Sequence, residues 1–209
     1  MKAVLLVTFA SVESLPALSA RYDGMLSMYR QQKLSRLKDE EDRARSMLAE
    51  FCLMEAVRRI VPSCPLPLTI RTEQNGKPFL IGSPLQISLS HAGAYAAAAV
   101  STLPVGVDVE RTRTVSESLV RRIATESEWA ALQELGITDE SFRDLFSAKE
   151  SLVKRDGIGL AALKQADITK TNAVRQLRFA DYVLSVASDL TAEWEVYTCG
   201  KDGLFCLHC

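Results

Sequence analysis

A short strand that carries two acidic residues most constrains what this chain can fold into. Residues 105–110 read Val-Gly-Val-Asp-Val-Glu, so that valine alternates with other residues in the period of two that is typical of a β-strand. The valines face one way, whereas Gly106, Asp108 and Glu110 face the other. We therefore expect two carboxylates roughly 6–7 Å apart along one face of the strand, with open space beside them at the glycine.

A helix with a charged face is expected later in the chain. Residues 146–154 read Phe-Ser-Ala-Lys-Glu-Ser-Leu-Val-Lys, within a helix predicted over residues 139–154 because apolar residues recur there at helical spacing. Glu150 and Lys154 are four residues apart and share a different face. If this face meets the acidic strand, three carboxylates gather, and they need a cation to offset their repulsion. Hard oxygen ligands with room for water and phosphate suit Mg²⁺.

Each of these patterns also has a simpler interpretation. An alternating Val-Asp-Val-Glu segment fits an amphipathic strand at the edge of a sheet. Glu150 with Lys154 fits a solvent-exposed helical ion pair, which contributes only a few tenths of a kcal/mol to stability. Taken one at a time, the two patterns leave open whether their charged residues form a site.

The composition excludes several classes of protein. Of the 209 residues, 47% are hydrophobic, which is enough for a core in one large domain or two small ones. A formal net charge of −1 argues against a general nucleic-acid-binding protein. No apolar run is long enough to predict a transmembrane helix. Residues 2–10 share the basic and apolar start of a signal peptide, but the apolar run is short. We interpret them as a first strand, which predicts a cytoplasmic protein.

The five cysteines do not predict a disulfide framework, because their number is odd and their spacing is irregular. Cys206 and Cys209, with Cys199 nearby, would need a fourth ligand to form a zinc site. The alternative, which we prefer, is a terminal strand with free thiols.

The expected elements predict the α+β fold class, with a helical portion and β-strands in each half of the chain. Helices are expected over residues 14–38, 41–60, 116–135 (as one helix or two) and 139–154. Strands are expected over residues 2–10, 68–73, 86–91, 95–101, 105–110, 166–169, 175–179, 182–187, 194–198 and 204–207. The two halves show no obvious sequence repeat.

Together, the strand motif and the helix motif resemble those of the 4′-phosphopantetheinyl transferases, in their larger, surfactin-synthetase-activating type. Residue types, order and spacing agree over about residues 40–165, although Phe146 stands where the family usually has tryptophan. The resemblance implies two similar α+β halves in a pseudo-twofold arrangement, with the site in the cleft between them. These halves would be residues 1–103 and residues 104–209, and the second would carry the acids.

The resemblance implies a holo-[acyl-carrier-protein] synthase that depends on Mg²⁺. Such an enzyme transfers 4′-phosphopantetheine from coenzyme A to a serine of an apo acyl or peptidyl carrier protein and releases adenosine 3′,5′-bisphosphate. It would serve fatty-acid, polyketide or nonribosomal peptide biosynthesis, and we expect a monomer with no nucleic-acid or membrane partner. Two alternatives remain open: a magnesium-dependent nucleotide phosphohydrolase, and a non-catalytic carrier-binding module of the same fold.

The resemblance also implies roles for the residues that match the strand and helix motifs. Asp108, Glu110 and Glu150 would bind Mg²⁺, and Glu150 would also activate the attacking serine. Lys154 would neutralise or protonate the departing phosphate. Lys149, about 100° around the helix from Glu150, would reach a phosphate from the flank.

The remaining matches concern coenzyme A. Ser90 and His91 match a Ser-His pair whose imidazole contacts phosphate, so that His91 joins the catalytic residues; a purely structural histidine is the alternative. Lys77 lies in a Gly-Lys-Pro motif that touches the nucleotide. Arg45 matches an arginine that binds the 3′-phosphate, for which a guanidinium fork is well suited. Pairing with a nearby carboxylate such as Asp42 is the alternative for this arginine.

Overall fold

The computed structural model describes residues 4–189, 193–200 and 203–208. The strands are β1 (Val4–Ser11), β2 (Ile70–Thr72), β3 (Pro78–Leu80), β4 (Gln86–Ala92), β5 (Tyr95–Ser101), β6 (Val105–Arg111), β7 (Val174–Phe179), β8 (Tyr182–Ser188), β9 (Glu193–Gly200) and β10 (Gly203–His208). The helices are α1 (Leu15–Arg21), α2 (Met28–Leu34), α3 (Glu40–Ile60), α4 (Glu117–Ile123), α5 (Glu126–Leu135) and α6 (Asp139–Asp156), with short 3₁₀ helices η1 (Val12–Ser14), η2 (Leu160–Gln165) and η3 (Ile168–Lys170). This mixture confirms the predicted α+β class.

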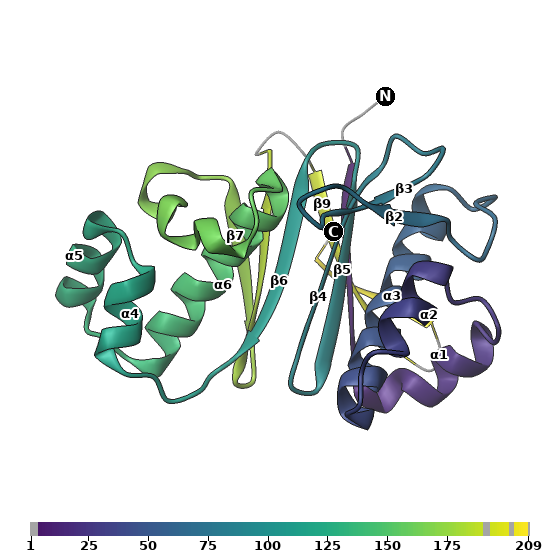
Figure 1. Ribbon diagram of the computed structural model, residues 1–209, viewed down its shortest axis with the longest axis horizontal. Coiled ribbons are helices and arrows are strands. Elements are labelled where there is room, and N and C mark those ends of the chain that lie inside the picture. Colours follow the sequence, from purple (N-terminus) through teal and green to yellow (C-terminus); the bar gives the residue numbers. More distant parts are fainter. Residues whose placement is uncertain (1–3, 190–192, 201–202, 209) are drawn as a thin grey trace.

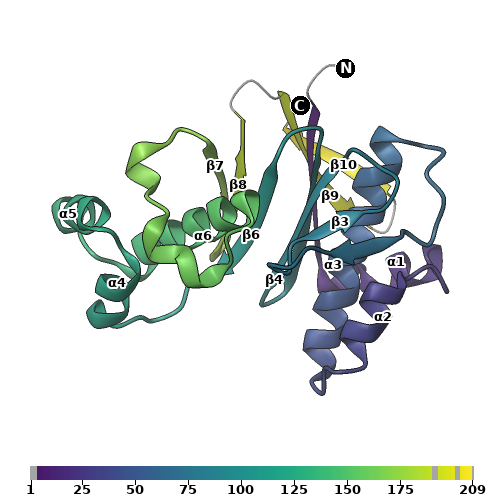
Figure 2. The same cartoon turned by 45° about the horizontal axis from the view of Figure 1, so that its top comes forward.

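The strands form two sheets that lie between two groups of helices. The larger sheet has the order β10-β9-β1-β5-β4-β3-β2, and the smaller one has the order β6-β8-β7. Figure 1 shows α1, α2 and α3 on the outer side of the larger sheet and α4, α5 and α6 on the outer side of the smaller one. Figure 2 shows the same arrangement from a second angle. The strands β4 and β6, from different sheets, therefore face each other near the middle of the molecule.

The larger sheet is held by the long helix α3. This helix begins after Asp39, whose carboxylate accepts the backbone N–H of Asp42 at 2.8 Å, as a typical N-cap does. Its buried side chains, including Phe51, pack on one face of β5, which presents Ala96, Ala98 and Val100. Because these side chains are short, the helix lies close to the sheet. The opposite face of β5 is left to meet the smaller sheet.

A second core joins the two sheets. It contains Val105, Val107 and Val109 from β6, together with side chains from β1, β5, β8 and β9. The valines of the acidic strand thus face the larger sheet, as the alternation predicted, and this leaves Asp108 and Glu110 on the side that faces α6. Burial of one face fixes the register of the strand, because a shift by one residue would exchange its two faces.

Helix α6 lies directly against β6, and Gly106 makes this possible. A Cβ atom at Gly106 would lie 1.9 Å from the carbonyl oxygen of Ser151 and 2.5 Å from the backbone nitrogen of Arg155. The helix begins at the N-cap Thr138 and ends at Gly157, which has a φ of 65° in the left-handed region that glycine adopts without strain. Any side chain at position 106 would therefore push α6 away from the acidic strand.

Several predictions from the sequence need correction or stay open. The predicted strand over residues 166–169 is wrong, because residues 168–170 form η3; the single helix over residues 14–38 is α1 and α2. Residues 193–200 pair in parallel with β1, so that the end of the chain returns to the sheet of the first half. The division at residue 104 and the pseudo-twofold relation stay predictions.

The cysteines follow the preferred expectation only in part. Cys52, Cys64 and Cys199 are free thiols, but Cys206 is disulfide-bonded, so that the expectation is wrong for that residue. Cys209 lies outside the described residues. In the parts of the chain that the structure describes, no helix is both long enough and apolar enough to cross a membrane.

Candidate functional site

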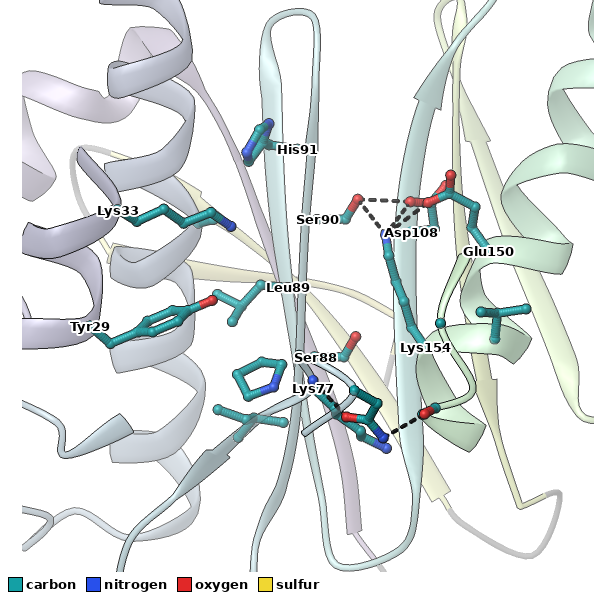
Figure 3. A pocket seen from close by; sticks show the side chains of 18 of the residues that line it. Tyr29, Lys33, Lys77, Ser88, Leu89, Ser90, His91, Asp108, Glu150 and Lys154 are labelled. Carbon is teal, nitrogen blue, oxygen red and sulfur yellow. Dashed lines mark hydrogen bonds and ion pairs between the residues drawn. The ribbon is translucent and has the colours of Figure 1, made fainter. Parts of the chain in front are cut away.

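The two sheets and their helices enclose a cavity of about 450 Å³ where β4 approaches β6. Its walls come from α2, the turn between β2 and β3, β4, β6, α6 and the residues that follow α6. Figure 3 shows Tyr29 and Lys33 entering from the α2 side, while Asp108, Glu150 and Lys154 enter from the opposite side. The cavity therefore joins residues that are far apart in the sequence.

The charged face of α6 meets the acidic strand, as the sequence led us to expect. Lys154 Nζ lies 2.6 Å from Asp108 Oδ1 and 3.2 Å from Glu150 Oε2, and Glu110 lines the same cavity. The side chain of Asp108 is only 2% exposed and that of Glu150 is 13% exposed. The strand β6 does lie at the edge of the smaller sheet, but its carboxylates line the cavity, and the alternative of an exposed helical pair is wrong for Glu150 and Lys154. We call Asp108, Glu110, Glu150 and Lys154 the acidic wall.

Crowding changes the proton affinities in the acidic wall. Burial, followed by repulsion from Asp108 and Glu150, raises the pKa of Glu110 to about 7. Burial and repulsion from Asp108 likewise raise the pKa of Glu150 to about 7, against the opposing effect of Lys154. Although burial opposes it, attraction by Asp108 and Glu150 raises the pKa of Lys154. Lys154 thus stays protonated as an ammonium. Its single positive charge is shared by the carboxylates around it.

One oxygen of the acidic wall has no hydrogen-bond partner. Asp108 Oδ1 accepts hydrogen bonds from Ser90 Oγ at 2.8 Å and from Lys154, but the buried Asp108 Oδ2 accepts none in the structure described here. A buried carboxylate oxygen without a partner is costly. Among the described residues, no group of three His, Cys, Asp or Glu side chains is already arranged as metal ligands. The unpaired oxygen and the mutual repulsion of the acids nevertheless fit a divalent cation that binds oxygen.

Two serines of β4 connect the larger sheet to the acidic strand. Ser88 Oγ accepts the backbone N–H of Val107 at 3.0 Å, and Ser90 Oγ receives a hydrogen bond from Lys154 at 3.1 Å while donating to Asp108. These side-chain bonds cross the gap between the sheets, where no backbone ladder is formed. They hold β6 in place, so that Asp108 points into the cavity.

The other side of the cavity is lined by positively charged side chains and an imidazole. Partial desolvation, with further repulsion from Arg30 and Lys154, lowers the pKa of Lys33, which forms no ion pair with any described residue. Burial, followed by repulsion from Lys33, Arg30 and Arg45, lowers the pKa of His91 to about 4. His91 is therefore neutral near pH 7 and can accept or donate a hydrogen bond. We call Lys33, His91 and Arg30 the cationic wall.

Arg30 differs from its neighbours in the cationic wall, because its charge is compensated. Its side chain is 2% exposed; Nε lies 3.1 Å from Glu50 Oε2, and a terminal nitrogen donates to Ser46 Oγ at 2.6 Å. Glu50 also accepts two hydrogen bonds from Ser27, the N-cap of α2. This buried pair fixes α2 against α3. Lys33, one turn further along α2, is thereby held at the cavity.

Two residues expected to bind coenzyme A already have protein partners. Lys77 lines the cavity, and its ammonium donates to the carbonyl oxygen of Arg155 at the end of α6. Arg45 lies outside the cavity lining and pairs with Asp42 and Glu41, so that the alternative of carboxylate pairing is confirmed. Its guanidinium also donates to the carbonyl oxygen of Gly93, in the turn that follows His91. Contacts of Lys77 and Arg45 with a nucleotide stay predictions.

The expectation for Lys149 is wrong. Its side chain is 0% exposed, and its ammonium binds Glu128 Oε2 at 2.6 Å and the carbonyl oxygen of Ala166. The reason is geometric: a residue next to Glu150 lies about 100° around the helix, and here that direction leads into the interior. Lys149 therefore does not line the cavity.

Comparison with known proteins finds similarity to one family of transferases. Residues 104–198 match the sequence model of the 4′-phosphopantetheinyl transferase superfamily. The chain is 26% identical over 144 residues to 4′-phosphopantetheinyl transferase Sfp of Bacillus subtilis (strain 168), a match that covers 68% of this chain and 64% of the relative. It is 27% identical over 137 residues to 4′-phosphopantetheinyl transferase gsp of Aneurinibacillus migulanus, covering 65% of this chain and 57% of that relative. The second half of this chain is thus similar in sequence to the 4′-phosphopantetheinyl transferase superfamily.

These matches confirm the resemblance drawn from the motifs. The matches span less than two thirds of the length of these relatives, at 64% and 57%. The matched range 104–198 contains the acidic wall, whereas α2 and β4, which build the cationic wall, lie before it.

The sequence predictions left Tyr29 and Ser88 out of this cavity, and they gave Lys33 only as a poorly matching companion of Arg45. Tyr29 and Lys33 are four residues apart on α2, so that both could have been assigned to one helix face. The segment before residue 40 has no clear motif, however, and nothing local indicated that this face meets a cavity. Ser88 alternates with Ser90 on β4, which is the signal that could have found it.

Proposed function

We propose that this chain transfers the 4′-phosphopantetheine group from coenzyme A to a serine of an apo acyl or peptidyl carrier protein. The transfer would require Mg²⁺ and would release adenosine 3′,5′-bisphosphate. Similarity to the 4′-phosphopantetheinyl transferases supports the reaction class. A monomeric state and a cytoplasmic location stay predictions from the sequence.

The observation that carries this proposal is the pairing of opposite walls in one cavity. A magnesium pyrophosphate substrate contains a divalent cation and several phosphate anions. The acidic wall has three carboxylates and an unpaired buried oxygen for the cation. The cationic wall has the imidazole of His91 and the ammonium of Lys33, which has no ion-pair partner in the described parts of the chain, for the anions. A site for an uncharged substrate would need neither arrangement.

Asp108, Glu110 and Glu150 would hold the metal ion, which would neutralise negative charge on the pyrophosphate when bound. Glu150 would accept the proton of the carrier serine, since its side chain lines the cavity beside the other acids. The serine oxygen then forms a bond to phosphorus while the bond to the bridging oxygen breaks. The released nucleotide phosphate keeps that electron pair.

Lys154 and His91 would act on the phosphates. The ammonium of Lys154 lies between the acids and Ser90, where it can neutralise the charge on the departing phosphate. His91 is neutral near pH 7 and can donate one hydrogen bond without adding charge. Lys33, at the exposed end of the cavity, would approach the phosphates that lie furthest from the reaction. Arg45 is the proposed ligand of the 3′-phosphate.

The test is to incubate the protein with coenzyme A, Mg²⁺ and a panel of apo carriers, and to measure carrier mass and released nucleotide together. We expect the mass of at least one carrier to rise by one phosphopantetheine group, with one equivalent of adenosine 3′,5′-bisphosphate released. Chelation of Mg²⁺ and replacement of the carrier serine by alanine should each abolish both signals. Nucleotide release without a carrier would support a phosphohydrolase instead, and carrier binding without a mass change would support a binding module.

A further inference from the structure

A buried ion pair lies on the side of α6 away from the cavity. Lys149 Nζ and Glu128 Oε2 are 2.6 Å apart, and the two side chains are 0% and 1% exposed. Lys149 comes from the middle of α6, next to Glu150, and Glu128 comes from the first turn of α5. Neither residue lines the cavity. A pair this deeply buried must have its remaining hydrogen-bonding groups satisfied, or it would be strongly unfavourable.

Both carboxylate oxygens and the ammonium have further partners, which come from three segments. Glu128 Oε2 also accepts the backbone N–H of Thr125 at 2.8 Å, which closes the capping box of α5. Glu128 Oε1 accepts the backbone N–H of Ile168 at 2.8 Å. Lys149 donates to the carbonyl oxygen of Ala166. The pair therefore ties α6 both to α5, which precedes it, and to the segment between η2 and η3, which follows it.

This network fixes the placement of α6 relative to its neighbours. Helix α6 carries Glu150 and Lys154, and the residues directly after it, Gly157 and Gly159, line the cavity. A small shift of the helix would move Glu150 relative to Asp108 on β6. Displacements of about 1 Å can reduce the rate of an enzyme by about a hundredfold.

We propose that Lys149 and Glu128 form a positioning pair, which sets the placement of Glu150 and Lys154 without touching the substrate. The proposal rests on the transferase function proposed above. It assigns a role to Glu128, which no motif indicated, and it replaces the phosphate contact expected for Lys149.

A rescue experiment separates the two roles of Lys149. Lys149→Met leaves a buried carboxylate without its cation, and Glu128→Gln leaves a buried ammonium without its anion, so that each single variant should be destabilised. We expect each to lower kcat by at least about tenfold, with the KM for coenzyme A changed by less than about threefold, because geometry rather than binding is lost. In the double variant Lys149→Met/Glu128→Gln, no uncompensated charge remains. We expect both its melting temperature and its kcat to exceed those of either single variant.

A phosphate contact predicts a different pattern. Lys149→Met would then raise the KM for coenzyme A, Glu128→Gln alone would have little effect, and the double variant would stay as defective as Lys149→Met. That pattern would overturn the proposal, and so would a double variant that melts below both single variants. Unfolding of all three variants would also overturn it, since the pair would then be needed for the fold itself.

Two controls make the result specific. Glu126→Gln changes an exposed carboxylate of α5 whose partner is Arg121, and it should leave kcat and the melting temperature unchanged. If the wild-type protein transfers nothing to any carrier, the proposed function fails. The recovery of melting temperature in the double variant can still be measured in that case, so that the two failures are distinguishable.

Discussion

The two walls of the cavity differ in how their charged side chains are paired. In the acidic wall, the chain supplies its own counter-ion, since Lys154 lies between Asp108 and Glu150. In the cationic wall, Arg30 has Glu50 as its partner, but Lys33 has no ion-pair partner among the described residues. Figure 3 shows Lys33 and Lys154 approaching the cavity from opposite sides. The acidic wall thus has one internal cation for three carboxylates, and the cationic wall has a lysine without an anionic partner among the described residues.

The pKa values of four groups, two in each wall, shift toward the uncharged form, whereas that of Lys154 shifts the other way. The pKa values of Glu110 and Glu150 rise to about 7, whereas that of His91 falls to about 4 and that of Lys33 also falls. The largest cause in each case is loss of water around the group. A cation at the acids and an anion at the cationic wall would each replace that lost solvation. The comparison therefore predicts that variants of the acidic wall affect turnover and variants of the cationic wall affect binding.

The largest effect is expected in the acidic wall. Glu150→Gln keeps the shape of the side chain but removes a charge beside the reacting atoms, so that kcat/KM should fall by at least about a hundredfold. Asp108→Asn should have an effect of similar size, because Asp108 is the buried partner of both Lys154 and Ser90. Single-turnover transfer to one responsive apo carrier is the measurement. Glu140→Gln, an exposed residue in the first turn of α6, is the matched control. Near-native rates in both site variants would remove the acids from the mechanism.

An intermediate effect is expected in the cationic wall. Lys33→Met keeps the apolar stem and removes the ammonium, so that the KM for coenzyme A should rise about tenfold to a hundredfold, as the loss of one charged hydrogen bond implies. The kcat at saturating coenzyme A should fall by much less, because Lys33 is proposed to contact phosphates away from the reaction. Lys38→Met, an exposed lysine beyond the end of α2, is the control. A fall in kcat with unchanged KM would erase the distinction between the two walls.

A smaller effect is expected for Arg45→Ala. Arg45 must exchange Asp42 and Glu41 for a phosphate, so that its net contribution to binding is smaller than that of Lys33. We expect the KM for coenzyme A to rise by less than about tenfold, and the KM for dephospho-coenzyme A to stay nearly constant, because only coenzyme A carries the 3′-phosphate. Steady-state kinetics with both substrates is the measurement. Equal changes for the two would exclude Arg45 from the 3′-phosphate site.

The two walls also differ in how far the sequence could predict them. Asp108, Glu110, Glu150 and Lys154 lie on one strand and one helix, and the periods of those elements place the side chains on defined faces. Lys33 and Ser88 come from elements whose mutual placement depends on tertiary packing, and no local pattern reports it. The same limit explains why the sequence did not predict the buried ion pair of Lys149. Thr125 and Glu128 could be read locally as a capping box, but not as the partner of a lysine on another helix.

The smallest effect, and the one that tests the electrostatics most directly, concerns stability without metal. The pKa of Glu110 is about 7 in the folded protein and near 4.5 as an ordinary value. Between these two pH values the unfolded chain has already released this proton while the folded protein still holds it. The contribution of Glu110 therefore lowers stability as pH rises from about 4.5 to about 7, and the loss is complete above pH 7.

Glu110→Gln removes this titration. In metal-free buffer, we expect the melting temperature of the wild-type protein to fall more between pH 5 and pH 8 than that of Glu110→Gln, while Glu140→Gln follows the wild type. Mg²⁺ added at pH 8 should raise the melting temperature of the wild type more than that of Glu110→Gln, because the variant lacks one oxygen anion for the cation. Thermal melts at the two pH values, with and without Mg²⁺, measure both differences. If wild type and Glu110→Gln show the same dependence on pH and on Mg²⁺, the carboxylates do not repel one another across the cavity, and the contrast between the walls loses its physical cause.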